Sequence, residues 1–126
     1  MLIYNKNLTK EEKKWLEFML SEDFLYKQNI VEQINCAIVE RNFTDFYLSI
    51  NFKYELNIKP IKIRERVPIE MRIYGEDRAP IQFLLHVISG LVSELEIFYA
   101  DSSKISNKIQ IEDAKREIII ASDLKY

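Results

Sequence analysis

Apolar and polar residues alternate through most of the second half of the chain, and this period of two predicts strands. In VPIEMRIY, residues 67–74, the apolar side chains fall on one face, while Glu70, Arg72 and Tyr74 fall on the other. Pro68 has no N–H to donate to a neighbouring strand. We therefore expect this strand at a sheet edge, or with a bulge at the proline.

The stretch LLHVISGLVSELEIFY, residues 84–99, predicts a β-hairpin that reverses near Gly90. A two-residue turn would place Phe83 opposite a glutamate and mix apolar with charged side chains. A three-residue loop over 88–90 would instead pair Phe83 with Leu95 and keep the apolar side chains of both arms on one face. We therefore predict the three-residue loop, with Gly90 in the left-handed conformation.

The first third of the chain has the spacing of helices. Thr9 and Glu12 in LTKEEKKWLEFML form a capping-box pattern, which predicts a helix over residues 10–21. A second helix is expected over 24–35, with Asp23 as its N-cap.

Further strands complete the expected sheet. CAIVERNF and DFYLSINF, separated by the polar residues 42–45, read as a second hairpin. The C-terminal segment 111–121 is ambiguous between helix and strand, and we favour a turn near 112–116 followed by a strand over 117–121. The chain is thus expected to be one α+β domain, residues 1–126, with two N-terminal helices packed on one face of a mainly antiparallel sheet of about five or six strands.

The hairpin also predicts a polar sheet face opposite the helices. Alternation places His86 beside Glu94 and Glu96, with Glu70 and Tyr74 on an adjacent strand. The chain has seven tyrosines and seven phenylalanines, and some of them share this polar phase. Tyrosine mixed with charged residues is typical of protein-binding surfaces, although ordinary sheet packing explains the same residues about as well.

Composition narrows the function classes. The 18 basic and 20 acidic residues leave a net charge of -2, so no direct nucleic-acid partner is expected. The two glycines stand far apart, whereas phosphate-binding loops need clustered glycines. No apolar run is long enough to span a membrane, and no secretory signal pattern begins the chain. With one cysteine and therefore no internal disulfide, we expect a soluble cytoplasmic protein without a membrane partner.

Few residues suggest chemistry. His86 with Glu94 is the pattern of an acid/base pair, but no nucleophile or oxyanion motif accompanies it, and a surface histidine with one hydrogen bond is the more common situation. One histidine and one cysteine make a zinc site improbable, and we expect no cofactor or metal. Cys36 is expected to be a small buried hydrophobe at the start of a strand.

A basic cluster also fits two interpretations. Lys62, Arg64 and Arg66 in IKIRER would alternate on one strand face, where they could contact phosphate. Because Glu65 interrupts them and acidic residues surround them, a solvated strand with charges that protect its edge explains the pattern as well.

Three blocks of the chain resemble a family of small bacterial domains of unknown function. They are LTKEEKKWLEFML, then VPIE, then PIQFLLHVISGLVSELEIFYAD, and the similarity is sharpest over residues 67–101. Members of that family recur beside polymorphic toxins and look like immunity proteins. The resemblance implies no catalytic residue, because the family has none assigned.

The resemblance implies that the chain binds and neutralises a cognate toxin C-terminal domain, for example a nuclease of a contact-dependent growth inhibition system. Combined with the polar face, it suggests five partner-binding residues: Glu70, Tyr74, Glu94, Glu96 and Tyr99. The alternatives are a small hydrolase or isomerase that uses His86 with Glu94, and a scaffold subunit that self-associates through the same face. We expect a monomer or a weak homodimer.

Overall fold

The computed structural model describes residues 2–75, 78–105, 109, 111 and 114–126. Two helices, α1 (Lys10–Met19) and α2 (Lys27–Cys36), precede six strands, and a short 3-10 helix, η1 (Ser122–Leu124), follows them. The strands are β1 (Ile38–Phe43), β2 (Leu48–Lys53), β3 (Ile69–Tyr74), β4 (Ile81–Ile88), β5 (Leu91–Tyr99) and β6 (Lys115–Ile120). They form one sheet in the order β1-β2-β5-β4-β3-β6, and all neighbours are antiparallel. The predicted α+β class and the predicted antiparallel sheet are confirmed.

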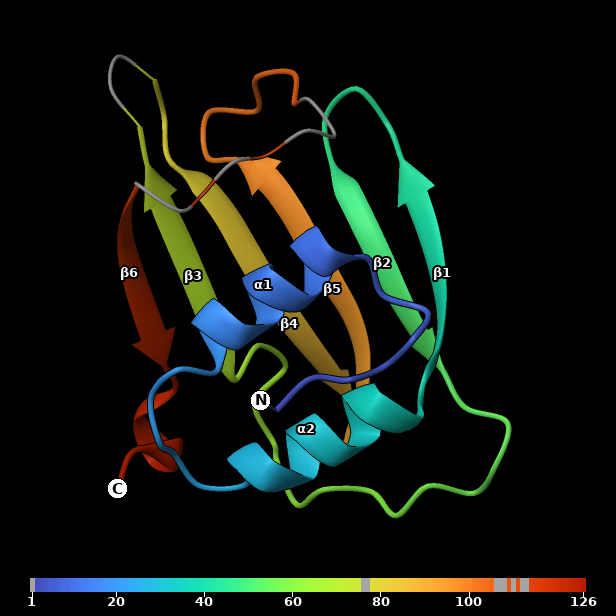
Figure 1. Cartoon of the computed structure of the whole chain (residues 1–126). Helices are drawn as coiled ribbons and strands as arrows, with labels where there is room; N and C mark the ends of the chain where they lie inside the picture. Colours follow the sequence, from blue (N-terminus) through green and yellow to red (C-terminus); the bar gives the residue numbers. More distant parts are fainter. Residues whose placement is uncertain (1, 76–77, 106–108, 110, 112–113) are drawn as a thin grey trace.

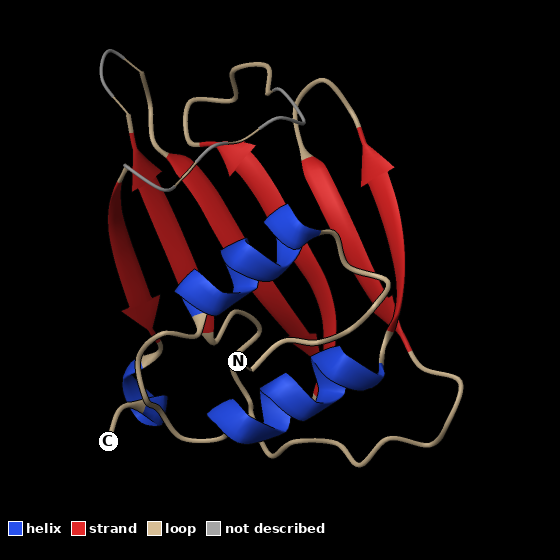
Figure 2. Ribbon diagram, in the orientation of Figure 1, coloured by secondary structure: helices blue, strands red, loops and turns tan. Residues whose placement is uncertain are grey.

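Both helices lie on the same side of the sheet, so the molecule has two layers (Figures 1 and 2). Trp15 of α1 contacts Phe83 of β4 edge-to-face, with ring centroids 5.8 Å apart. The apolar side chains of the middle strands point towards the helices and are fully buried, among them Met71, Phe83 and Leu95. Their burial supplies the main stabilising free energy of the fold.

The predicted capping box begins α1. The Thr9 hydroxyl accepts a hydrogen bond from the Glu12 N–H, and the Glu12 carboxylate accepts one from the Thr9 N–H at 2.8 Å. Arg41 of β1 holds the same carboxylate with two of its nitrogens, one of them Nε at 2.6 Å. Glu12 is therefore buried yet fully paired, which a buried charge requires.

The second helix begins later than its sequence predicts. Asp23 does not cap it; α2 begins at Lys27, after Tyr26 in the left-handed conformation at φ 72°. The reason is tertiary: Phe24 is buried in the core, and the Leu25 N–H donates to the Leu124 carbonyl at 2.8 Å. This contact holds the segment before α2 against the C-terminal segment. Residues 24–27 form a turn, in which the Lys27 N–H donates to the Phe24 carbonyl at 3.3 Å.

Pro68 does not mark a sheet edge. Strand β3 begins one residue after it and lies between β4 and β6, so the prediction of an edge or a bulge was wrong. Proline is tolerated just before a strand, because no ladder N–H is needed there. Its carbonyl still accepts a hydrogen bond from the Ala121 N–H at 3.0 Å.

The register of the β4–β5 hairpin differs from the predicted one. Ser89 and Gly90 form a two-residue turn, both with positive φ, and Ile88 pairs with Leu91. The predicted three-residue loop and the Phe83–Leu95 pairing are therefore wrong. Phe83 instead pairs with Ile97.

A β-bulge in β5 allows the two-residue turn and still keeps the apolar side chains of β4 and β5 on the same face of the sheet. Val87 pairs with Val92 but His86 pairs with Glu94, so Ser93 is the extra residue on β5. The shift of one position returns the apolar residues beyond it to the helix-covered face. The predicted sharing of faces is thus correct beyond the bulge, whereas Val92 replaces Ser93 in the core.

Two further segments, the C-terminal strand and IKIRER, differ in how well their patterns predicted them. The C-terminal strand is confirmed as β6, but it begins at Lys115, so residues 115 and 116 belong to the strand and not to the turn expected at 112–116. Residues 112 and 113 of that turn lie outside the described residues. The IKIRER segment forms no strand, although Ile61 and Ile63 are buried and Lys62 and Arg64 are exposed. Its backbone is tied to the hairpin, since the Ile61 N–H donates to the Gly90 carbonyl at 2.8 Å.

Candidate functional site

The sheet face turned away from the helices, here called the open face, is the candidate site. Alternation along β3, β4 and β5 places polar and aromatic side chains there, opposite the buried apolar positions. Glu70, Tyr74, Glu94 and Glu96 all lie on this face, as the sequence predicts. Most side chains of the open face are half-buried by their neighbours.

Glu94 belongs to a polar group at the β2–β5 junction. Its carboxylate accepts a short hydrogen bond of 2.5 Å from the Ser49 hydroxyl. The Asn51 amide in turn donates to the Ser49 oxygen at 3.2 Å. Ser49 and Asn51 were not predicted as site residues, yet they fix the position of this carboxylate.

His86 is bonded to Glu96, one of the two glutamates expected beside it, and not to Glu94, with which the enzyme alternative paired it. Its Nε2 lies 2.9 Å from Glu96 Oε1, while Arg66 Nε donates to its Nδ1 at 3.2 Å. An Nδ1 that accepts is unprotonated in the neutral ring, so the proton sits on Nε2 and is donated to the carboxylate. Both ring nitrogens are therefore engaged within the protein.

A third group on the open face surrounds Arg72. Its guanidinium lies 3.5 Å from Glu70 Oε1 and 3.7 Å from Glu117 Oε1. Tyr74 donates its hydroxyl proton to the same Glu117 oxygen at 2.9 Å. The interaction with Tyr74, and then the charge of Glu70, raise the pKa of Arg72 above its usual range. This network presents its charges at the surface already paired.

Tyr99 is the one predicted partner-binding residue that falls on the other side. It pairs with Ile81, whose side chain is in the core, so Tyr99 belongs to the helix-covered face. Its hydroxyl accepts a hydrogen bond from Arg78 Nη1 at 3.3 Å. Phe98 occupies the open-face position next to Glu96, and counting by twos from Glu96 would have identified it.

A groove of about 380 Å³ is hollowed at one end of the open face. It is lined by side chains of the β1–β2 turn, of β5 and of the residues just after it: Phe46, Tyr47, Glu96, Phe98, Tyr99 and Ser102. We call it the aromatic groove. Because aromatic residues and one carboxylate line it, it is suited to a group that is both cationic and partly apolar.

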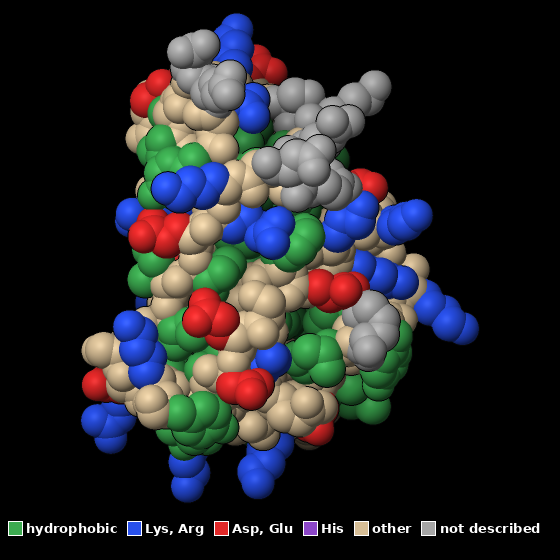
Figure 3. Space-filling model, turned by 60° about the vertical axis from the view of Figure 1, so that its left-hand side comes forward, with side chains coloured by type: hydrophobic (Ala, Val, Ile, Leu, Met, Phe, Trp, Pro, Cys, Tyr) green, Lys and Arg blue, Asp and Glu red, His purple; other side chains and the backbone are tan. Residues whose placement is uncertain are grey.

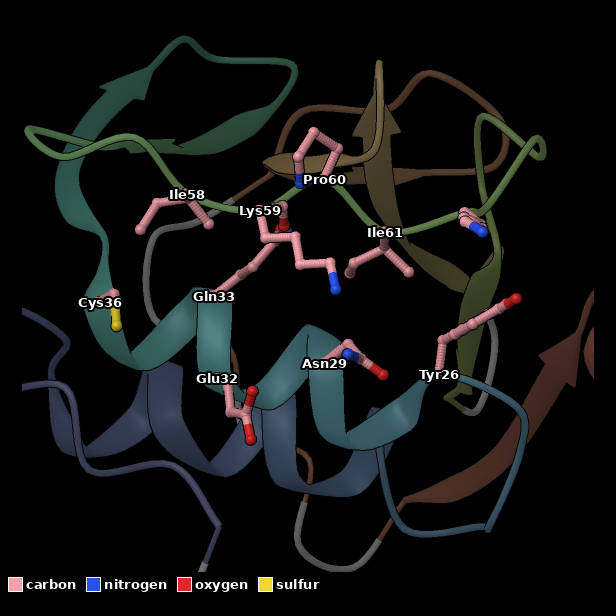
Figure 4. A pocket seen from close by; sticks show the side chains of 10 residues that line it. Tyr26, Asn29, Glu32, Gln33, Cys36, Ile58, Lys59, Pro60 and Ile61 are labelled. Carbon is pink, nitrogen blue, oxygen red and sulfur yellow. The ribbon is translucent and has the colours of Figure 1, made fainter.

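A second hollow, of about 400 Å³, lies between α2 and the loop over residues 58–62. Figure 4 shows Gln33 reaching from α2 towards Lys59, while Glu32 points away from the loop. Gln33 donates to the carbonyls of Lys59 and Gly90 and accepts from the Val92 N–H, so its amide joins helix, loop and hairpin. This hollow is thus built around a structural residue.

Cys36 ends α2 and is exposed, which corrects the expectation of a buried hydrophobe.

Among the described residues, no three His, Cys, Asp or Glu side chains lie close enough together to hold a metal ion. None of the helices in the described part of the chain is long and apolar enough to cross a membrane. On the β6 side of the molecule, basic and acidic side chains are mixed with apolar ones (Figure 3).

These observations define a two-layer α+β protein whose antiparallel sheet has one face away from its helices. The chain belongs to the family described as domain of unknown function DUF6984, whose model matches residues 5–111. No curated protein and no solved structure matches it.

Proposed function

We propose that this protein is an immunity protein that binds a cognate toxin domain through the open face and neutralises it. The toxin would belong to a contact-dependent growth inhibition system or to another polymorphic toxin system, and neutralisation would take place in the cytoplasm. The single observation that carries the proposal is the gathering of Glu70, Tyr74, Glu94 and Glu96 on the sheet face opposite the helices. The toxin system itself is suggested by the family resemblance of the three sequence blocks.

The composition of the open face supports a protein partner. Interfaces are enriched in tyrosine, phenylalanine and arginine, and these residue types occur here among carboxylates. A standard interface buries about 800 Å² on each partner, an area that one face of a six-stranded sheet can provide. Glu94 and Glu96 form no ion pair with a lysine or arginine of the described chain. No lysine or arginine among those residues neutralises their charges, so the two carboxylates can attract basic groups, such as those with which a nuclease binds phosphate.

The alternative, a hydrolase or isomerase, would depend on the His86–Glu96 pair. Substitution of His86 by Asn separates the two functions. A binding protein should retain protection with H86N, because the amide keeps a polar group at this position. An enzyme should lose nearly all turnover, because asparagine does not transfer protons at neutral pH.

The direct test measures the affinity for the C-terminal domain of a secreted protein encoded beside this chain's gene. We expect the double reversal E94K/E96K to weaken binding at least tenfold, or about 1.4 kcal/mol. E94Q/E96Q removes the charges while keeping the shape and hydrogen-bond acceptors. The matched control is E22K/E55K, which changes the net charge equally at exposed positions outside the sheet.

The outcomes are distinct when folding is first verified by circular dichroism. A loss of affinity in both Glu94/Glu96 variants but not in the control supports the open face as the interface. Equal affinity of all variants would remove this face from the proposal. Absence of binding and of protection from growth arrest by that domain would overturn the immunity function. Light scattering of the protein alone would reveal a scaffold subunit, which self-associates without the toxin.

A further inference from the structure

The aromatic groove at the end of the open face differs in charge from the rest of that face. Glu96 is the only charged residue among its six lining side chains. Its Oε1 is bonded to His86, while its Oε2 forms no hydrogen bond with the described residues. One oxygen of this groove-lining carboxylate is therefore available to a hydrogen-bond donor other than the described residues.

The walls of the groove are aromatic and partly exposed. Phe46 is 53% exposed, and Phe98 stands on the open face two residues after Glu96. Tyr47 directly precedes β2 and falls in the same phase, because Leu48 is buried on the helix side. Aromatic faces carry negative electrostatic potential and attract cations, most often the guanidinium group of arginine.

The same chain already pairs guanidinium groups with aromatic rings. Arg116 lies over the Phe18 ring with its Cζ 3.8 Å from the centroid, on the helix-covered face. Arg78 lies over Tyr99, with its Cζ 6.0 Å from the centroid of the ring. Neither arginine lines the groove, so neither supplies the cation for Glu96.

We infer that the aromatic groove receives an arginine side chain of a partner protein, with its guanidinium on Glu96 Oε2 and its apolar stem against Phe98, Tyr47 and Phe46. An apolar side chain in this position would desolvate the carboxylate without replacing its hydrogen bonds, which is unfavourable. An anionic group would be repelled by the carboxylate. Charge and shape together therefore favour a cation on a long apolar stem, which arginine provides.

The inference deepens the proposed function, and it rests on that proposal for the partner being a protein. It names the anchoring residue that the toxin domain would contribute, and it places this residue at the end of the open face. Anchors of this kind, aromatic or arginine in a pocket, carry most of the free energy of typical interfaces.

The test uses small probes with the full chain. A blocked Gly-Arg-Gly peptide is titrated into isotope-labelled protein, and the citrulline peptide, which has the same shape without the charge, serves as the matched probe. We expect saturable shifts of the Tyr47, Glu96 and Phe98 amide signals with arginine, and at least fivefold weaker binding of citrulline. E96Q and F98A should each reduce arginine binding at least fivefold. F43A, which removes a 50% exposed phenylalanine on the other side of the same hairpin, should not.

Equal binding of the arginine and citrulline peptides, or shifts confined to the hollow beside α2, would overturn the inference. The toxin domain distinguishes this failure from failure of the proposed function. If the domain binds E96Q and F98A as tightly as the natural chain, the groove is not its anchor site, although the immunity function stands. If the arginine peptide binds but the toxin domain does not, the groove's preference stands and the immunity function fails.

Discussion

The two faces of the sheet are built from the same strands, but one is apolar and buried and the other is polar and partly exposed. On β3 and β4, Met71 and Phe83 are fully buried beneath the helices, while their neighbours Arg72 and Gln82 pair on the open face. One side therefore gains free energy from apolar burial, and the other keeps polar groups accessible. The difference shows that a strand residue's contribution to stability depends on its phase more than on its type, which the following substitutions test.

The largest difference is expected between two phenylalanines. F83A removes a ring with no exposed surface and its contact with Trp15, and it should lower the free energy of unfolding by about 4 kcal/mol. F98A on the open face should cost about 1 kcal/mol, because its ring is already partly in water. Urea unfolding of both variants measures the difference. Similar losses would mean that the two faces contribute equally to stability.

Breaking an ion pair should also cost more stability on the helix-covered face than on the open face. R41A leaves the buried Glu12 carboxylate without its partner and should cost about 3 kcal/mol at neutral pH. K53A breaks an open-face pair with Glu40 whose side chains are 62% and 59% exposed, and it should cost less than about 0.5 kcal/mol. Chemical denaturation at low and moderate salt measures both variants. A K53A cost comparable with that of R41A would contradict the distinction.

The R41A effect should also depend on pH. Burial alone raises the pKa of Glu12, but the hydrogen bonds from Arg41 and from the Thr9 N–H outweigh it and hold the pKa below its usual range. Stability from a lowered carboxyl pKa is present above the unfolded-state value and is lost as the pH falls through the folded-state value. The stability gap between the natural chain and R41A should therefore narrow in acid. A gap that stayed constant from neutral pH into acid would exclude this ionic contribution.

The turn that joins β4 to β5 offers a backbone test. Gly90 has φ 78°, and an added Cβ would lie 2.6 Å from the Ile61 carbonyl oxygen, so G90A should cost about 2 kcal/mol. Its neighbour Ser89 also has positive φ, and S89G should stabilise by up to about 1 kcal/mol through relief of strain. Thermal unfolding of both variants checks the pair. Destabilisation by S89G would rule out strain at that position.

The last substitution, S49A at the polar junction of β2 and β5, should have only a small effect on stability. The substitution removes the hydroxyl that donates to Glu94, but the half-buried carboxylate recovers water, so the cost should be about 1 kcal/mol. Binding of the toxin domain should weaken more than stability, because Glu94 would lose its fixed orientation. Calorimetry with that domain tests this order, and a change in stability alone would make Ser49 purely structural.

Much of the candidate site could be predicted from the alternation of residues along the strands. The errors of that prediction have identifiable physical causes. Glu70, Tyr74, Glu94 and Glu96 share a face because successive strand residues point to opposite sides. Tyr99 was grouped with them by residue type, whereas its odd position relative to Glu96 places it on the helix side. The enzyme alternative paired His86 with Glu94, which the structure places directly opposite it, but the His86 side chain reaches diagonally to Glu96.

In the fold, too, features that depend on near neighbours in sequence were predicted correctly, and features that depend on distant contacts were not. The capping box at Thr9 was correct because it depends on residues only three positions apart. The beginning of α2 was predicted too early because the contact between Leu25 and Leu124 joins segments far apart in sequence. The bulge at Ser93 could not be predicted, since it reconciles the geometry of a tight turn with burial along the whole hairpin.

By itself, the sequence determined where the main strands lie, and which side chains share a face wherever the alternation is unbroken, because alternation and capping act between near neighbours in the chain. Only the tertiary structure decided the strand order, the register of the central hairpin and the gathering of Phe46, Tyr47 and Phe98 around Glu96. These features arise from pairing between distant strands, and their free energies depend on burial that no local pattern contains.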